Sequence, residues 1–178
     1  IQALARIIRE TLSGRENIAY LLIGTGGPMK DSIETEFCEE VASGKVIFTG
    51  YVPHESIPEH LAALDIVLAP YPDLPFFYYS PVKIFEYLAC GKAVVSTDIG
   101  QIGTLIDHGE NGLIYPPGDV SGMIEGIRRL IRDPDFRRKL GEEAEKRTRQ
   151  SHSWSIKARE WNRIITVVTG RKSGSERN

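Results

Sequence analysis

The sequence predicts an α/β fold in which a Rossmann-like, doubly wound parallel sheet is followed by C-terminal helices. Short apolar runs alternate with helical patterns, the runs are apolar on both faces, and long amphipathic patterns follow the last run. Strands that are apolar on both faces are typical of parallel sheets covered by helices on both sides. Alternation of strand and helix on this scale is typical of repeated βαβ units.

The individual elements follow from the same patterns. Gly, Pro or Asp bounds the apolar runs that predict strands, which lie at 18–27, 45–52, 65–71, 92–98 and 111–119. Apolar residues at helical spacing predict helices over 1–12, 28–41, 57–64, 82–90, 101–107, 120–132, 135–150 and 153–168. Right-handed crossovers then place helices on both faces of the sheet.

Composition limits the class of protein. The chain has 178 residues, of which 41% are apolar and 26% charged, as in a soluble domain with a sizeable core. The net charge of −2 argues against sequence-independent binding of nucleic acid, although a local basic pocket for one phosphate group is compatible with it. Cys38 and Cys90 stand outside any CxxC and without a His cluster, so we expect neither a metal site nor a disulfide framework. No run approaches the roughly 18 apolar residues of a membrane span.

The ends of the sequence suggest a domain that begins part-way through. The first residues, "IQALARIIRE", already have helical spacing, whereas "GRKSGSERN" at the other end is polar. We therefore expect one domain over 1–169 that lacks its first strand, followed by a disordered polar tail over 170–178.

The loops after the strands are the places to look for a ligand, because open parallel sheets bind ligands at the carboxyl ends of their strands. In "GTGGP", Gly24 and Gly26 allow either a tight turn or a contact with phosphate. The motif is not a full GxGxxG and has no P-loop lysine. After the second strand, Tyr51 and Val52 are placed to meet a nucleobase, and the alternative is an ordinary strand end marked by Pro. His54 is interpreted as an exposed turn residue.

The stretch "SPVKIFEYLACGK" combines charges with an apolar helix. Ser80 or Pro81 begins the helix, which is expected to leave several free N–H groups at its positive end. Lys83 lies one turn in, and Glu86 follows on the same face. A helix start with a Lys suits a diphosphate, and a Glu suits the paired hydroxyls of a ribose. The alternative is a surface Lys–Glu pair.

These residues carry a resemblance to a known family. "SPVKIFEYLACGKAVVSTDIG" resembles the donor-nucleotide segment of the retaining glycosyltransferases called glycosyl transferases group 1, which have the two-domain GT-B architecture. "LLIGTGGPMK", "VIFTGYVPHESIPEHLAALDIVLAPYP", "HGENGLIYPPGD" and "SHSWSIKA" follow in the family's order. The resemblance implies the C-terminal half of such an enzyme, which moves a sugar from a nucleotide-diphospho-sugar to an acceptor with retention.

The resemblance also implies roles for individual residues. In the family, a Glu at the position of Glu86 holds the donor ribose, and the helix start at 80–82 approaches the diphosphate and the sugar. The turn at 50–53 lies by the base. No metal and no cofactor are implied, since the nucleotide-diphospho-sugar is a substrate and a helix dipole with cationic side chains carries the diphosphate charge.

The sequence departs from the family pattern in places. The family often has two Glu residues with seven others between them, and the first falls on Tyr78 here. Tyr79 and Pro81 replace the usual glycines, and Lys83 is expected to take over part of the phosphate binding. These changes leave open an alternative, a non-catalytic nucleotide-sugar-binding or regulatory module of the same fold. A receiver-like signalling domain would need acidic residues clustered after the first strand, and "LLIGTGG" has none.

The remaining expectations concern the other half of the cleft. The resemblance implies that an N-terminal GT-B domain of the same protein binds the acceptor and holds the catalytic residues, so we expect the isolated domain to be inactive. The acceptor, a glycan or a lipid-linked molecule, is not identified. A cytoplasmic location is implied, with peripheral contact at the inner membrane surface as a variant found in the family.

Overall fold

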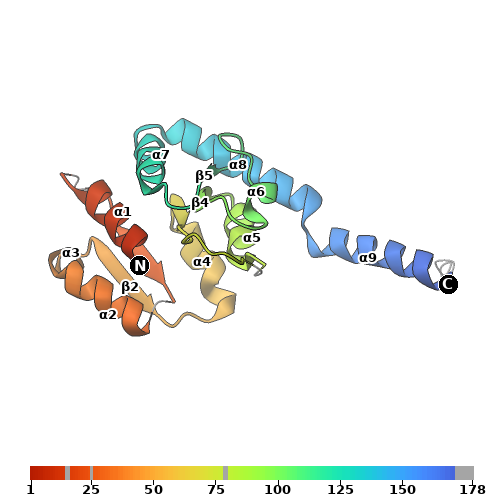
Figure 1. The fold of residues 1–178 in the computed structure, drawn as a ribbon, viewed down its shortest axis with the longest axis horizontal. Helices are drawn as coiled ribbons and strands as arrows, with labels where there is room; N and C mark the ends of the chain where they lie inside the picture. The colour runs from red at the N-terminus through yellow and green to blue at the C-terminus, as the bar shows by residue number, and fades with distance from the viewer. Residues whose placement is uncertain (15–16, 25, 78–79, 171–178) are drawn as a thin grey trace.

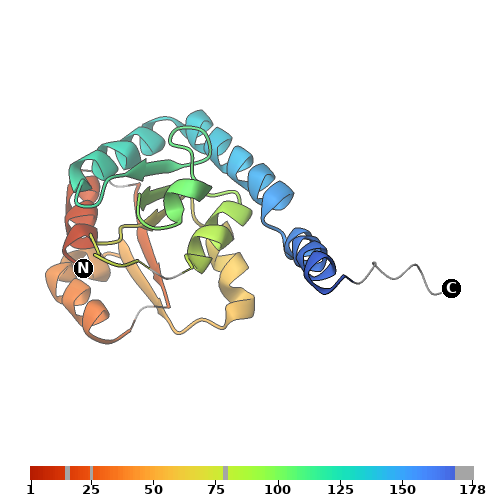
Figure 2. The same cartoon turned by 45° about the vertical axis from the view of Figure 1, so that its right-hand side comes forward.

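Parallel strands in two sheets form the centre of the molecule (Figures 1 and 2). The computed structural model describes residues 1–14, 17–24, 26–77 and 80–170. The first sheet pairs β1 (Tyr20–Ile23) with β2 (Val46–Gly50), and the second has the order β3 (Ile66–Ala69), β4 (Ala93–Thr97), β5 (Leu113–Tyr115). All these pairs are parallel, which confirms the predicted α/β class.

Helices precede, separate and follow the strands. Their bounds are α1 (Gln2–Leu12), α2 (Gly27–Glu36), α3 (Cys38–Ala42), α4 (Ile57–Ala62), α5 (Val82–Ala89), α6 (Ile102–Leu105), α7 (Val120–Arg132), α8 (Pro134–Ser151) and α9 (Trp154–Thr169). The single helix predicted over 28–41 is wrong. Phe37 breaks it, with φ −119° and ψ 39°, and its buried ring packs in the same cluster as Leu22 and Val46. Burial of this ring therefore outweighs continuation of the helix.

The side chains of β4 show that helices cover both faces of the second sheet. All five residues of β4 are buried. Val94 packs in one cluster with Ile84 of α5, whereas Val95 packs in another with Ile124 of α7. Successive strand residues point to opposite faces, so the two clusters lie on opposite sides of β4. The doubly wound arrangement is confirmed.

A third cluster holds α1 and α2 against the first sheet. It includes Ile8, Leu22 and Ile33, all buried. The buried Thr11 hydroxyl lies 2.6 Å from the Tyr20 hydroxyl, which joins the end of α1 to the start of β1. Burial raises the pKa of Tyr20, so this phenol stays neutral and can keep the hydrogen bond.

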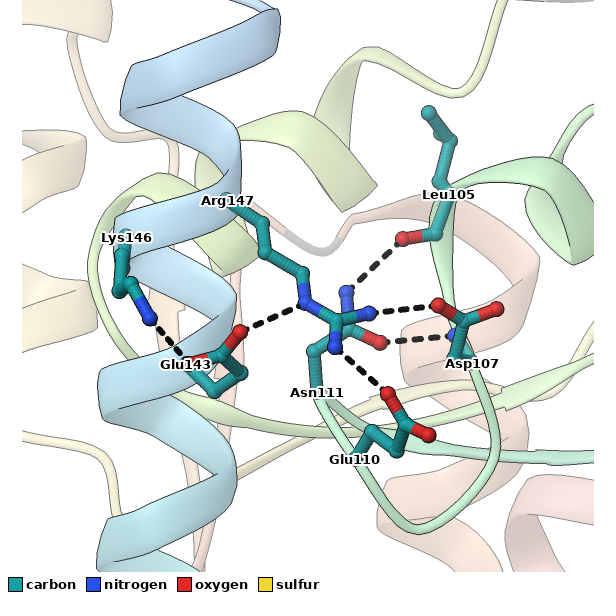
Figure 3. A network of polar contacts seen from close by, with 7 residues as sticks. All are labelled: Leu105, Asp107, Glu110, Asn111, Glu143, Lys146 and Arg147. Carbon is teal, nitrogen blue, oxygen red and sulfur yellow. Dashed lines mark hydrogen bonds and ion pairs between the residues drawn. The ribbon is translucent and has the colours of Figure 1, made fainter.

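Helix α8 is fixed against the second sheet by close packing and by an arginine. A Cβ at Gly141 would lie 2.0 Å from the Gly91 carbonyl oxygen, so the backbones touch at that point. Figure 3 shows Arg147 of α8 between three carboxylates: Nη1 is 2.5 Å from Asp107, Nη2 is 2.5 Å from Glu110, and Nε is 2.8 Å from Glu143. Arg147 therefore ties the loop between α6 and β5 to α8.

Helix α9 extends away from the sheets (Figures 1 and 2) and has no buried residue. Its apolar side chains repeat at spacings of three and four and so lie on one face. Trp154 is 90% exposed, and Trp161, Ile165 and Val168 are exposed with it. Among the described helices, none is both long and apolar enough to cross a membrane. The apolar face of α9 is uncovered in this chain.

Candidate functional site

The predicted helix start forms where expected, at the N-terminus of α5. Pro81 is the N-cap residue, with φ −80° and ψ 66°. Two of the amides at this end already have local partners, because the Val82 N–H donates to the Ser80 carbonyl and the Ile84 N–H to the Pro81 carbonyl, each at 2.9 Å. The expectation of several free N–H groups is therefore wrong for these two, and a ligand here depends more on side chains.

Lys83 and Glu86 diverge although they lie three residues apart on α5. The Lys83 ammonium sits over the ring of Tyr71, with Nζ 4.4 Å from the centroid. The Glu86 carboxylate instead faces His54, with Oε1 4.0 Å from Nδ1. Lys83 is exposed and the Glu86 side chain keeps 29% of its exposure, so neither is sealed in the core. The simple Lys–Glu surface pair is not formed.

Aromatic side chains lie close to this part of α5. Tyr71 and Phe77 meet edge to face, with centroids 5.0 Å apart and an interplanar angle of 72°. Burial, together with the nearby Tyr71 and Glu86, raises the pKa of Tyr87 to about 12. Although Lys83 as a whole residue is exposed, burial of its charged end lowers its pKa, because an ammonium that loses water favours its neutral form. Helix α5 thus presents a partly desolvated cation over an aromatic ring, with a carboxylate three residues further along.

The loop after β2 lies next to this helix. The short 3₁₀ turn His54–Ser56 carries His54 to Glu86, so the loop and α5 border the same surface. Tyr51 is 89% exposed, and Val52 is half-buried. This places the residues predicted to meet a nucleobase in the segment that adjoins Glu86. His54 itself is exposed, as predicted, but its contact with Glu86 had no signal in the sequence.

The glycine-rich loop after β1 borders a hollow that lies along β2. Gly24 has φ +70°, and its N–H donates to the Thr49 hydroxyl at 3.2 Å, while Gly26 is extended just before α2. Gly26 and Tyr51 are among the residues that line an open hollow of about 780 Å³ along β2. No residue of α5 lines it. The structure therefore brings Gly26 near Tyr51 but does not join them with Lys83 and Glu86 in one cavity.

The remaining candidate residues either lie outside the described part of the chain or bond to nearby carbonyl groups. Tyr78, and Tyr79 beside it, lie outside the described residues. Nδ1 of His60 and Nδ1 of His108 each lie 2.8 Å from a carbonyl oxygen, that of Ser56 and that of Ile114 respectively, to which a ring N–H can donate. In the described ranges, no group of three His, Cys, Asp or Glu side chains is arranged to hold a metal ion.

Comparison with solved structures identifies the fold of the chain. A sucrose-phosphate synthase from Thermosynechococcus elongatus superposes with a TM-score of 0.77 at 23% identity, over 95% of this chain and 42% of that one. HepE from Anabaena in complex with UDP-glucose superposes with a TM-score of 0.72 at 22% identity, over 93% of this chain and 44% of that one. The fold is that of the GT-B glycosyltransferases.

The family follows from sequence. The model of the family "Glycosyl transferases group 1" matches residues 1–133, and the chain belongs to this family. An alpha-D-kanosaminyltransferase from Streptomyces kanamyceticus is 27% identical over 146 residues, which are 81% of this chain and 35% of that protein. The chain thus spans about a third of the length of that relative.

Proposed function

We propose that this chain is the donor-binding domain of a glycosyltransferase that moves a sugar from a nucleotide-diphospho-sugar to an acceptor with retention at the anomeric carbon. The observation that carries the proposal is the position of Glu86. Its carboxylate keeps 29% of its exposure on a helix that buries an apolar face, and it faces the loop that follows β2. A carboxylate at that place can accept two hydrogen bonds from the hydroxyls of a ribose.

The other residues take roles around Glu86. Tyr51 and Val52 contact the base, and the helix start at Ser80, Pro81 and Val82 approaches the diphosphate and the sugar. Lys83 supplies positive charge to the diphosphate, since an ammonium close to a leaving group stabilises its developing charge. Gly24 and Gly26 contact the donor from the loop after β1, and Tyr78 is assigned to donor binding from its place in the sequence alone. Neither a metal nor a cofactor takes part.

UDP-sugars are the donors to test first. The support is HepE, a related fold whose solved complexes contain UDP and UDP-glucose. The residues around Glu86 are compatible with any nucleoside diphosphate, because ribose and diphosphate are common to all of them. The acceptor is a glycan or a lipid-linked molecule.

We further propose that residues 1–169 form a domain that a strand from the same protein completes. β1 pairs with β2 and β3 pairs with β4, and neither β1 nor β3 has a second partner among the described strands. One parallel strand between them would join the two sheets into one. An N-terminal GT-B domain of the same protein would close the cleft over the donor, hold the catalytic residues and cover the apolar face of α9. Residues 170–178 would remain a polar tail.

Catalysis would need both domains, because the reacting groups must be held together in one closed cleft. The isolated domain is therefore expected to bind the donor and to transfer nothing. We place the enzyme in the cytoplasm, with peripheral contact at the inner membrane surface as the variant for a lipid-linked acceptor.

A second candidate is a non-catalytic nucleotide-sugar-binding or regulatory module. Tyr78 favours it, because a phenol stands where the family often has its first Glu. The two candidates differ in turnover. The test is to incubate the full-length protein with UDP-, GDP- and ADP-sugars and candidate glycan and lipid-linked acceptors, and to follow nucleotide release and the anomeric proton of the product by NMR. Release with a retained anomer supports the enzyme, release with an inverted anomer contradicts retention, and binding without release supports the module.

A further inference from the structure

The position of the Lys83 ammonium is set by an aromatic ring and not by a carboxylate. Nζ lies 4.4 Å from the Tyr71 centroid, and no ion pair of Lys83 with a carboxylate is found in the part of the chain that the structure describes. A ring face attracts a cation through its quadrupole and leaves the positive charge in place. A carboxylate would compete with a bound anion for that charge, whereas a ring does not.

Tyr71 is itself held firmly at the carboxyl end of β3. The Tyr71 N–H donates to the Ala69 carbonyl at 3.0 Å, and the buried Thr97 hydroxyl of β4 donates to the Tyr71 carbonyl at 3.0 Å. The Phe77 ring packs edge to face against Tyr71. Behind it, a Cβ at Gly100 would lie 2.4 Å from Phe77 Cδ1, so the loop after β4 supports Phe77 closely. The ring of Tyr71 is therefore a fixed platform supported by both strand ends.

We propose that Tyr71 is a positioning residue that holds the Lys83 ammonium beside the start of α5, ready to contact the diphosphate of the donor. This inference rests on the proposed function, because it needs a nucleoside diphosphate at the helix start. Lys83 has a long, flexible stem, and a cation that is already in place loses fewer rotamers when the anion binds. Burial lowers the pKa of Lys83, which agrees with an ammonium that has lost part of its water and so attracts a phosphate more strongly.

The local amides strengthen the argument. The N–H groups of Val82 and Ile84 already donate to local carbonyls, so they contribute less to an anion than a free helix terminus would. Charge for the diphosphate must then come from a side chain near the helix start. Lys83 is on the first turn of α5, and Tyr71 decides where its charge lies.

Binding measurements on the full-length protein test this role. Among UDP, GDP and ADP, the diphosphate that binds the wild type best serves as the probe, and its monophosphate is measured beside it. Tyr71→Leu removes the ring and is expected to weaken diphosphate binding about three- to thirtyfold, the range of a cation–π contact. The loss should be smaller for the monophosphate. Tyr71→Phe keeps the ring and should bind within about twofold of the wild type.

A double-mutant cycle separates positioning from a general effect on folding. In a Lys83→Met background, Tyr71→Leu should cause no further loss, because the ammonium that the ring positions is already gone. Phe76→Leu is the matched control, since Phe76 is an aromatic residue of the same loop that is 82% exposed and should leave binding unchanged.

The possible outcomes separate the role of Tyr71 from the donor-binding function. An equal loss from Tyr71→Leu in the presence and absence of Lys83, or no loss at all, would overturn the positioning role while leaving the donor-binding function in place. If the wild type binds none of the three diphosphates, the proposed function fails first and the role of Tyr71 fails with it.

Discussion

His54 Nδ1 and Glu86 Oε1 lie 4.0 Å apart and join the loop after β2 to helix α5. The His54 side chain is 86% exposed, so the contact is a loose surface pair that contributes little to stability. Glu86 is positioned mainly by its helix, whose apolar face is anchored by the buried Ile84 and Leu88. The carboxylate is therefore free to exchange this neighbour for a ligand.

Replacing His54 should accordingly have little effect. We expect His54→Ala to change the free energy of unfolding by less than about 0.5 kcal/mol, and donor affinity by less than about threefold, because exposed ion pairs contribute about 0–1 kcal/mol. Chemical denaturation and calorimetric titration measure both quantities. A loss of affinity as large as that of a Glu86 variant would instead show that His54 is part of the binding site.

Donor binding should weaken in alkaline solution because of Lys83. Burial lowers the pKa of this ammonium below its ordinary value of 10.5 in the free protein, and a bound diphosphate favours the charged form. Affinity should therefore be full below the lowered pKa and fall as the pH rises through it, with net proton uptake on binding in that range. Calorimetry in buffers of different ionisation enthalpy measures the uptake.

Lys83→Arg is the control for this pH dependence, because a guanidinium stays charged throughout the range. The nucleobase can also lose a proton in alkaline solution, and the variant shares that effect with the wild type. An identical decline in both proteins would assign the pH dependence to the nucleotide and not to Lys83.

Gly100 should be costly to replace for two separate reasons. It has φ +57°, and a Cβ there would lie 2.4 Å from Phe77 Cδ1. Gly100→Ala is expected to destabilise the fold by about 2–5 kcal/mol, the sum of a left-handed backbone and an overpacked contact. Gly118→Ala is the matched control, because Gly118 has φ +86° with open space around it and should cost only about 1–2 kcal/mol. If urea denaturation showed the same loss of unfolding free energy for Gly100→Ala and Gly118→Ala, Phe77 would have to move aside freely.

Arg147 should stabilise the loop between α6 and β5 without affecting the rest of the sheet. Its guanidinium bridges Asp107, Glu110 and Glu143. These hydrogen bonds raise the pKa of Arg147, and the bond to Glu143 has the largest effect. Arg147→Met should speed amide hydrogen exchange in residues 106–112 while leaving the β4 amides protected. Arg149→Met removes only a pair within α8 and should leave the loop unchanged. Uniform loss of protection over the whole sheet would contradict a local role.

Much of the fold could be predicted because local patterns agreed with the final packing. The bounds of α7 match the prediction, since the Asp119 carboxylate accepts from the Gly122 N–H at 2.8 Å and caps the helix at the expected residue. The break at Phe37 could not be predicted, because it depends on the burial of that ring against β1 and β2. Periodicity along one segment carries no information on such a contact.

The candidate site could also be predicted only in part from the sequence. Two charged residues on a helix with an apolar face indicated a place where water or a ligand can reach them; Lys83 is exposed, and the Glu86 side chain keeps 29% of its exposure. Their neighbours could not be predicted, because Tyr71 and His54 reach α5 from other strand ends. The local bonds of the Val82 and Ile84 amides depend on the backbone angles of Pro81, and helix-start preferences alone do not specify these.

The most direct test of the central claim is donor binding by Glu86→Ala. Ligand-observed NMR and calorimetry on the full-length protein, with UDP, GDP and ADP, should find one nucleotide that binds the wild type. Glu86→Ala should weaken it by at least about tenfold, since each hydrogen bond to a charged group contributes about 1.5–3 kcal/mol and the ribose contact has up to two of them. Glu55→Ala, an exposed carboxylate in the adjoining loop, should bind as the wild type does. Equal affinity in Glu86→Ala and wild type would contradict a ribose contact at Glu86 and with it the donor site described above.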